Sequence, residues 1–363
     1  MLRPRIKRAL QFSVYNDRRI QLGFFEFMDD DDRVIEFVIE MMDGTRSFNE
    51  VVAAVLLKHP SLDTRSIAEV ISRFINLGLV EDAAGAPPPE LTKRELERYS
   101  RGAEYFAIMD EQQRSSPYEV QGRLKNSSVC VLGVGGTGSS VALSLAMSGV
   151  GSLHVADFDL IEESNLNRQV LFCEADIGMS KVTRAVERLR QVNSNVVVTG
   201  EELQVTCTAD IVPLMKRCDV FVLCADRPVE VIQQWTNEAA LQTGRTWFFA
   251  LSRGANTSVG GFEPHKTSCH ECAAEHLRRR RKESGFLRSW DPDEAPAVPA
   301  VTPMATLSAA LCSFDVLHYL GGVRTQLLGV EINLSLHDFT KVDRVVFERL
   351  PDCTACGPHD PTR

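Results

Sequence analysis

A glycine-rich loop near residue 133 is the first segment whose residue types and spacing could do chemistry. The run 133–138, Gly-Val-Gly-Gly-Thr-Gly, has the spacing G-x-G-x-x-G after an expected strand at 128–132 and before an expected helix at 139–147. Glycines let the backbone approach phosphates closely, and a helix N-terminus favours negative charge. The loop therefore predicts a nucleotide site, and it fits NAD as well as ATP. Its candidate residues are Gly133, Gly135, Gly136 and Gly138.

Polar and charged residues follow the next expected strand, 152–156. Asp157 ends that strand, where an acidic side chain can bind ribose hydroxyls. Asp159 and Arg168 follow in a polar run, and Lys181 begins the next expected helix. An enzyme that cleaves ATP at the α-phosphate must neutralise charge as pyrophosphate leaves, whereas a dehydrogenase has no need of these cations. The run favours ATP. The alternatives are surface charges for Asp159 and Lys181 and a structural ion pair for Arg168.

A further carboxylate, Asp226, comes after the apolar strand 220–224. Ligands of open α/β sheets bind at the carboxyl ends of the strands. A carboxylate in that place suits a magnesium ion that bridges phosphates. We therefore expect Asp226 to position Mg²⁺.

Four of the ten cysteines form two C-x-x-C pairs, Cys269 with Cys272 and Cys353 with Cys356. Four thiolates make a closed tetrahedral zinc site. A redox role for one pair is the alternative, but two matched pairs argue against it. The sequence predicts a structural Zn²⁺ site that attaches the C-terminal end of the chain to its domain.

The elements that must position these residues alternate between strand and helix from about residue 95. This alternation predicts an α/β fold with a Rossmann-like, doubly wound, mostly parallel sheet. Residues 278–303, first charged and then proline-rich, are expected to form a long loop. Further strands are expected near 195–199 and 219–224, and a further helix at 181–192.

Residues 1–85 are expected to form a separate, small α+β domain of winged-helix type, with 86–94 as a linker and 95–363 as the catalytic domain. Two strands, 6–14 and 20–27, precede three helical stretches near 31–42, 47–58 and 63–77, and 79–81 is a possible last strand. The free sheet edge of such a domain can bind a peptide as an added strand. DNA binding is the common alternative, but four consecutive aspartates at 29–32 and a net charge of -9 weaken it.

The composition is that of a soluble globular protein, with 44% hydrophobic and 25% charged residues among 363. No apolar run approaches the roughly 20 residues of a membrane span, and the N-terminus lacks the features of a signal peptide. We expect a cytoplasmic protein with neither a membrane nor a nucleic acid as partner.

The stretch 133–181 resembles the nucleotide site of the ThiF/MoeB/HesA and ubiquitin-activating adenylyltransferases. The resemblance covers about 95–357, because residues 98–101, Arg-Tyr-Ser-Arg, are similar to the R-Y-x-R motif of that family. It implies a homodimer in which Arg101 reaches into the partner's active site, and a zinc site at the two C-x-x-C pairs. One departure is Asp226-Arg227, where relatives have Asp-Asn. The carboxylate is kept, but the contact that the asparagine makes in relatives is put in doubt. The resemblance also implies that Gly136 and Asp157 hold ATP, that Ser164, Asn165 and Leu166 line its pocket, that Asn167, Arg168 and Lys181 meet the phosphates, and that Asp226 positions magnesium.

Two features narrow the activity that the resemblance implies to adenylation of a peptide, without a later thioester or persulfide step. Relatives that pass the acyl group to a thiol carry a cysteine in the loop after the first C-x-x-C, whereas here none occurs between Cys272 and Cys312. Some ninety residues precede the R-Y-x-R motif, and this layout resembles the peptide-adenylating enzymes of microcin C-type and pantocin-type antibiotic maturation. The basic run 278–282 would attract an acidic peptide, or it is a solvated face.

The resemblance thus implies ATP-dependent adenylation of a carboxylate on a ribosomally made precursor peptide, with the leader bound by the N-terminal domain. One alternative is adenylation of a sulfur-carrier protein's C-terminus. The other is a non-catalytic scaffold that binds the leader for a cyclodehydratase.

Overall fold

The computed structural model describes residues 2–29, 32–229, 231–253, 255–284 and 299–357. The chain divides into two compact units, one of residues 1–125 with 321–324 and one of 126–320 with 325–363. Each unit has a hydrophobic core of its own.

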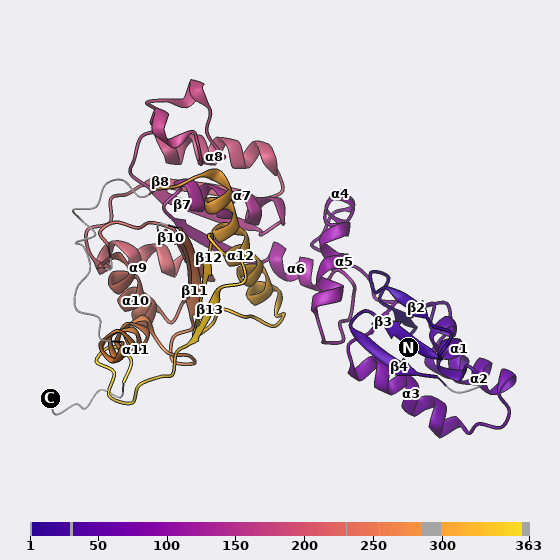
Figure 1. Ribbon diagram of the computed structural model, residues 1–363. Helices are drawn as coiled ribbons and strands as arrows, with labels where there is room; N and C mark the ends of the chain where they lie inside the picture. Colours follow the sequence, from indigo (N-terminus) through magenta and orange to yellow (C-terminus); the bar gives the residue numbers. More distant parts are fainter. Residues whose placement is uncertain (1, 30–31, 230, 254, 285–298, 358–363) are drawn as a thin grey trace. The chain divides into compact units, whose positions relative to one another are not determined.

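The larger unit is built on a sheet in the order β13-β12-β11-β10-β9-β6-β7-β8 (Figure 1). Pairing is parallel from β10 to β8, as the alternation of strands and helices predicted, and antiparallel from β10 to β13. The doubly wound, mostly parallel sheet is therefore confirmed, and the antiparallel extension is an addition to it. The strands are β6 Ser128–Leu132, β7 Ser152–Asp157, β8 Val197–Glu202, β9 Val220–Leu223, β10 Thr246–Arg253, β11 Asn256–Phe262, β12 Val330–Ser335 and β13 Val342–Val346.

Helices cover both faces of this sheet, with α9, α10 and α11 on one face and α12 on the other (Figure 1). The face under α9 and α10 buries Phe221, Trp247 and Phe249 in a continuous apolar core. Among the described residues no helix has both the length and the hydropathy to cross a membrane. The helices are α7 Gly136–Met147, α8 Lys181–Val192, α9 Thr208–Lys216, α10 Val231–Thr243, α11 His270–Glu283 and α12 Thr302–Gly321, with short 3₁₀ turns η1 Glu163–Asn165 and η2 Glu174–Asp176.

The expectation of one long loop over 278–303 is wrong at both ends. Residues 278–283 continue helix α11, and 302–303 begin helix α12. Arg278 and Arg279 both pair with Glu275, three and four residues earlier, at 2.7 and 2.8 Å. Opposite charges at this spacing support a helix. Residues 285–298 lie outside the described part of the chain.

The smaller unit is the α+β fold expected of the N-terminal region. Strands β2, β3 and β4 form an antiparallel sheet, and β1 pairs with β5. The single strands expected at 6–14 and at 20–27 are each divided into two, β1 with β2 and β3 with β4. Gly23, with a φ of 61°, makes the turn between β3 and β4. The elements are β1 Pro4–Ile6, β2 Phe12–Val14, β3 Arg19–Leu22, β4 Phe25–Met28, α1 Val34–Met41, α2 Phe48–Lys58, α3 Thr64–Asn76, β5 Val80–Asp82, α4 Lys93–Arg98, α5 Ser100–Met109 and α6 Glu119–Lys125.

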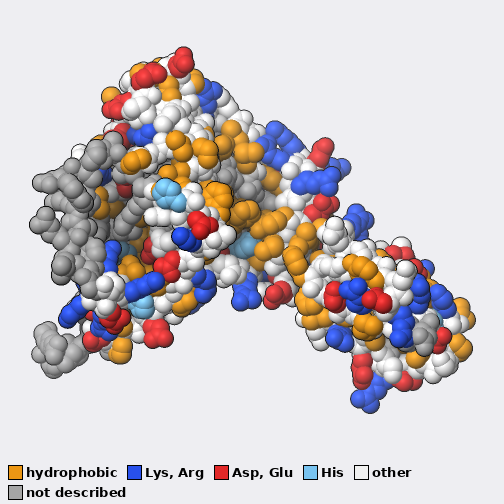
Figure 2. All heavy atoms as spheres, viewed as in Figure 1, with side chains coloured by type: hydrophobic (Ala, Val, Ile, Leu, Met, Phe, Trp, Pro, Cys, Tyr) orange, Lys and Arg blue, Asp and Glu red, His pale blue; other side chains and the backbone are white. Residues whose placement is uncertain are grey.

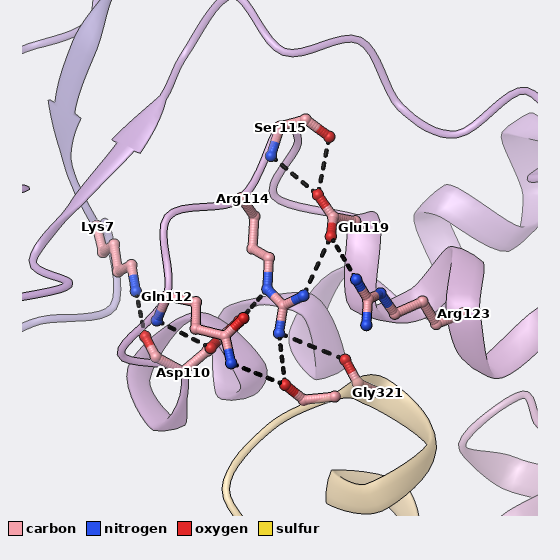
Figure 3. Close-up of polar contacts among 9 residues, drawn as sticks. Lys7, Asp110, Gln112, Arg114, Ser115, Glu119, Arg123 and Gly321 are labelled. Carbon is pink, nitrogen blue, oxygen red and sulfur yellow. Dashed lines mark hydrogen bonds and ion pairs between the residues drawn. The ribbon is translucent and has the colours of Figure 1, made fainter.

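An arginine holds the C-terminal part of this unit together (Figure 3). Arg114 donates to the Asp110 carboxylate, to Glu119 Oε1 at 3.1 Å and to the Gly322 carbonyl oxygen at 2.8 Å. Because its guanidinium has five N–H donors, one side chain can join three segments. These bonds attach residues 321–322 to the 110–125 region of the same unit.

Candidate functional site

A cavity of about 500 Å³ opens at the carboxyl ends of the parallel strands, within the usual range for small-molecule sites. The chain proceeds from β6 to β7 and β8, then returns to place β9 on the other side of β6. This reversal of strand order creates a crevice at the ends of β6 and β9. The structure brings together nine of the predicted site residues as lining of the cavity, namely Gly133, Gly135, Gly136, Asp157, Asp159, Asn165, Arg168, Lys181 and Asp226.

The glycine loop requires glycine for steric reasons. Gly133 has a φ of 88°, and a Cβ there would lie 2.7 Å from the backbone nitrogen of Ala225. A Cβ at Gly138 would lie 1.8 Å from the Gly133 carbonyl oxygen. Gly138 does not line the cavity; it keeps the loop closely packed on the start of α7.

Asp157 lies at the boundary between loop and cavity. Its Oδ2 accepts a hydrogen bond from the backbone N–H of Val134 at 2.7 Å, and its Oδ1 accepts from the N–H of Asp159 at 2.9 Å. The carboxylate is almost fully buried and still lines the cavity. Asp157 therefore fixes the glycine loop in addition to its expected contact with ribose.

The predicted cations are held in defined orientations. Lys181 is buried, and its Nζ lies 2.7 Å from Asp159 Oδ2. Arg168 Nη1 donates to the carbonyl oxygen of Ser164 and to Asn167 Oδ1, both at 2.8 Å. Both side chains line the cavity, so their charge is available to a polyphosphate there.

The residues between Ser164 and Asn167 divide into two groups. Asn165 is buried, lines the cavity and accepts from the N–H of Glu162 at 3.2 Å. Ser164, Leu166 and Asn167 do not line the cavity. Asn167 instead donates to the carbonyl oxygen of Ala300 at 3.1 Å and orients Arg168.

Two predicted catalytic residues lie in different surroundings. Asp226 lies three residues after the end of β9, is exposed and lines the cavity, as a residue that binds a metal ion with a nucleotide should. Arg101 lies on α5 in the smaller unit; its side chain is 90% exposed and pairs with Glu104 at 3.1 Å. Its action in a partner's active site stays a prediction.

Sequence reasoning missed several lining residues. Gln169 is buried, and its Oε1 has no hydrogen-bond partner among the described residues. Its position directly after Arg168 was the available signal. The apolar wall formed by Leu203, Val205 and Ile232 gave none, because these residues come from separate segments.

Cys224 also lines the cavity, which raises the question of a covalent step. Burial raises the pKa of its thiol to about 12. The thiolate is the nucleophilic form, so this cysteine is unreactive at neutral pH. Cys224 is therefore no candidate for a covalent step in this cavity.

The four cysteines of the C-x-x-C pairs converge on one point. All four sulfurs lie within 4.8 Å of one another. The separations are 3.8 Å for Cys269–Cys272, 3.7 Å for Cys269–Cys353 and 3.5 Å for Cys272–Cys356. A tetrahedron with Zn–S bonds of about 2.3 Å requires S–S separations of about 3.8 Å. The cluster therefore fits a tetrahedral metal ion that would join the start of α11 to the C-terminal segment.

Comparisons with known proteins agree with this geometry. Protein HesA of Leptolyngbya boryana is 29% identical over 274 residues, which are 76% of this chain and 90% of that protein. The sulfur carrier protein adenylyltransferase of Thermus thermophilus is 28% identical over 284 residues, 75% of this chain and 94% of that protein. A crystal structure of E. coli MccB with succinimide superposes with a TM-score of 0.77 at 24% identity, covering 98% and 99% of the two chains, and shows the same fold.

The family comparison covers the part of the chain that holds this site. The model of the ThiF family matches residues 100–355, which include the nucleotide cavity and all four clustered cysteines. The match extends over well more than half of the chain. The chain therefore belongs to the ThiF family and is an ATP-dependent adenylyltransferase.

Proposed function

We propose that this enzyme adenylates a carboxylate on a ribosomally made precursor peptide and so activates it for amide formation or cyclisation. The observation that carries the proposal is a folded N-terminal unit whose three-stranded sheet has two outer strands open to pairing. The same chain carries a cavity lined by nine of the residues predicted to bind the nucleotide. The similarity to HesA covers 76% of the chain, whereas the fold shared with E. coli MccB covers 98%. One MccB structure is described as a complex with N-formylated MccA, which supports a peptide as the partner here.

The lining of the cavity suggests how ATP is held. Asp157 binds the ribose, and the backbone of the glycine loop faces the phosphates. Arg168 and Lys181 neutralise charge on the triphosphate. Mg²⁺ at Asp226 would supply further positive charge to the phosphates, and zinc at the cysteine cluster would be structural.

Adenylation then requires in-line attack. The peptide carboxylate attacks the α-phosphorus, the bond from that phosphorus to the bridging oxygen breaks, and pyrophosphate carries away the electron pair. The attacking carboxylate is already ionised, so no general base is needed. Arg101 of a partner subunit would add charge to this step in a homodimer.

The N-terminal unit offers the surface for the leader. Strands β2 and β4 are the outer strands of their sheet, and hydrophobic side chains are exposed among charged ones on this unit (Figure 2). On the β4 side, the Arg73 guanidinium of α3 lies 5.6 Å from the centre of the Phe27 ring. A surface hollow follows α3 from Arg65 to Leu77. A leader added to β4 would gain backbone hydrogen bonds and place side chains along this hollow.

Intact-mass spectrometry tests the proposal directly. Short peptides encoded beside the gene are incubated with the enzyme, ATP and magnesium. We expect one peptide to gain AMP or lose water, and Arg168→Ala to abolish this change. Arg217→Ala is the matched control, because Arg217 is exposed, pairs with Glu201 at 3.3 Å and lies outside the cavity. Unchanged masses for every peptide would contradict the proposal.

Adenylation of a sulfur-carrier protein is the second candidate, favoured by the similarity to the sulfur carrier protein adenylyltransferase of Thermus thermophilus. The N-terminal unit has no evident use in that reaction. Adenylation of a Gly-Gly protein tail, without binding of any precursor leader, would favour this candidate. The third alternative, a non-catalytic scaffold, does not suit a chain with an intact adenylyltransferase cavity.

A further inference from the structure

Arg227 lines the nucleotide cavity, and the ATP chemistry described above gives it no role. It directly follows Asp226, the candidate for magnesium, and it is exposed. The family resemblance implies asparagine at this position, so the arginine is particular to this chain. It adds a permanent positive charge to the cavity, because a guanidinium stays protonated at any pH that a protein meets.

The segment after β9 is fixed against the glycine loop. The backbone N–H groups of Cys224 and Ala225 both donate to the Leu132 carbonyl oxygen, at 2.8 and 3.0 Å, immediately before the loop. A Cβ at Gly133 would lie 2.7 Å from the backbone nitrogen of Ala225. Consecutive Cα atoms are about 3.8 Å apart, so the Cα of Arg227 lies within about 8 Å of that of Ala225. An arginine side chain from there can reach the space in which the loop would hold phosphates.

A second arginine contacts the other end of the loop. A Cβ at Gly136 would lie 3.1 Å from Arg168 Cγ and 3.3 Å from its Cδ. Arg168 belongs to the segment after β7 and Arg227 to the segment after β9, and β6 with its glycine loop lies between these two strands. The two arginines therefore flank the phosphate site, one on each side of β6.

The charges of the cavity show why a third cation matters. Lys181 Nζ lies 2.7 Å from Asp159 Oδ2, so part of the lysine charge is already offset. A triphosphate carries more negative charge than one Mg²⁺ neutralises. Without Arg227 the lining would hold four carboxylates and two cations, an excess that repels a polyanion. The charged lining residues are Asp157, Asp159, Glu162 and Asp226 on the acidic side and Arg168, Lys181 and Arg227 on the basic side.

The strand order indicates which phosphates meet Arg227. Asp157, the candidate for ribose binding, ends β7, and the glycine loop follows β6. The strands lie in the order β7-β6-β9, so a nucleotide with its ribose at Asp157 extends its phosphates over the loop towards Asp226 and Arg227. The β- and γ-phosphates are the farthest from the ribose. A guanidinium suits them, because its planar fork binds two phosphate oxygens at once.

We propose that Arg227 is a catalytic residue that binds the β- and γ-phosphates of ATP and stabilises the pyrophosphate that leaves during adenylation. The bond between the α-phosphorus and the bridging oxygen breaks, and that oxygen keeps the electron pair. The guanidinium neutralises the charge that develops there and transfers no proton. The inference concerns the ATP side of the reaction and holds for any acyl substrate.

The test measures binding of ATP, AMP and inorganic pyrophosphate to the full-length enzyme by isothermal titration in the presence of magnesium, without an acyl substrate. Arg227→Asn should weaken the binding of ATP and of pyrophosphate about tenfold or more, because hydrogen bonds to charged groups are lost. Its affinity for AMP should stay within about twofold of the wild-type value, because AMP lacks both phosphates that Arg227 binds. Arg227→Lys should recover part of the loss, since it restores the charge without the planar fork.

Arg217→Asn is the matched control. Arg217 is exposed, pairs with Glu201 at 3.3 Å and lies outside the cavity, so the same change of charge there should alter none of the three affinities. Unchanged binding of ATP and pyrophosphate in Arg227→Asn would overturn the inference. An equal loss for AMP, or no recovery in Arg227→Lys, would also overturn it, because the cause would then be a disturbed loop and not the missing charge. These outcomes leave the proposed peptide substrate intact, since its test is a change in the mass of the peptide.

Discussion

At the scale of single residues, the nucleotide cavity depends on close backbone contacts as much as on charge. Asp157 accepts the N–H of Val134 and thereby holds the glycine loop beneath the site of the phosphates. Gly138 has no contact with the cavity, and its lack of a side chain lets the loop pack against the Gly133 carbonyl. The first prediction concerns this packing.

Gly138→Ala should weaken ATP binding without unfolding the protein. The added Cβ would lie 1.8 Å from the Gly133 oxygen, so the loop must move. Overpacking of this kind costs about 1–3 kcal/mol, which corresponds to a loss of about fivefold to about 140-fold in affinity. Isothermal titration with ATP and magnesium measures the change.

Gly102→Ala is the control for this substitution. Gly102 lies within helix α5, and an added Cβ there comes no closer than 3.9 Å to Gln121. We expect unchanged ATP affinity. An equal loss in both variants would show that the effect of Gly138→Ala is not local to the loop.

At the scale of elements, two parts of the structure join segments that are far apart in the sequence. The cysteine cluster connects the first turn of α11 with residues 353–356. In the N-terminal unit, β4 presents an outer strand edge beside α3.

Cys353→Ser should remove one equivalent of zinc per chain and lower the melting temperature. Replacing one of four sulfur ligands opens a closed tetrahedral site, and structural zinc stabilises the fold that holds it. Elemental analysis and calorimetry measure both effects. Cys207→Ser, at an exposed cysteine outside the cluster, should change neither. Full zinc content in Cys353→Ser would contradict the assignment of this cluster.

Glu26→Pro should abolish leader binding and leave the N-terminal unit folded. The backbone N–H of Asp29 donates to the Arg18 carbonyl oxygen. Backbone N–H groups along β4 point alternately towards and away from β3, so the N–H of Glu26, three residues earlier, points away from β3. Proline on an outer strand is tolerated but cannot donate to an added strand. Fluorescence anisotropy with a labelled precursor peptide measures binding.

The matched control is Val14→Pro on β2, the other outer strand. Tyr15 donates its N–H to the Arg19 carbonyl, so Val14 likewise faces away from β3. We expect this variant to bind the peptide normally. Loss of binding in Val14→Pro alone would move the leader site to β2.

At the scale of the whole molecule, the question is whether one chain completes its own active site. Arg101 lies in the smaller unit, with its side chain 90% exposed, whereas Arg168 lines the nucleotide cavity of the larger unit. The family resemblance implies that Arg101 acts across a homodimer. Complementation between two inactive variants tests this.

Arg101→Ala and Arg168→Ala should each be inactive alone and partly active when coexpressed. In a mixed dimer the intact cavity of the first variant receives Arg101 from the second, so random pairing restores about a quarter of the sites. Pyrophosphate release by the purified mixture measures the recovery. Absence of any recovery would contradict action in trans.

The sequence by itself determined the chemical inventory and the type of fold. The spacing of Gly133, Gly135, Gly136 and Gly138, with Asp157 after the next strand, predicted the loop and its place in a parallel sheet. These features are local, because a strand, a tight turn and a helix start are set by neighbouring residues. Nine predicted residues accordingly line one cavity. The spacing within each C-x-x-C pair is also local and predicted two ligands each for a metal ion, but the tertiary structure brings the two pairs together from positions 84 residues apart.

Only the tertiary structure decided which of these residues face the cavity and what lies beside it. Ser164, Leu166 and Asn167 share a polar run with Asn165, but their direction depends on the 3₁₀ turn η1 and on a bond from Asn167 to Ala300, far along the chain. A further cavity of about 130 Å³ in the larger unit joins residues of α10, β10, β11, α11 and β12, which no local pattern relates. Such sites arise from long-range strand pairing, where side chains from segments about a hundred residues apart meet on one face of a sheet.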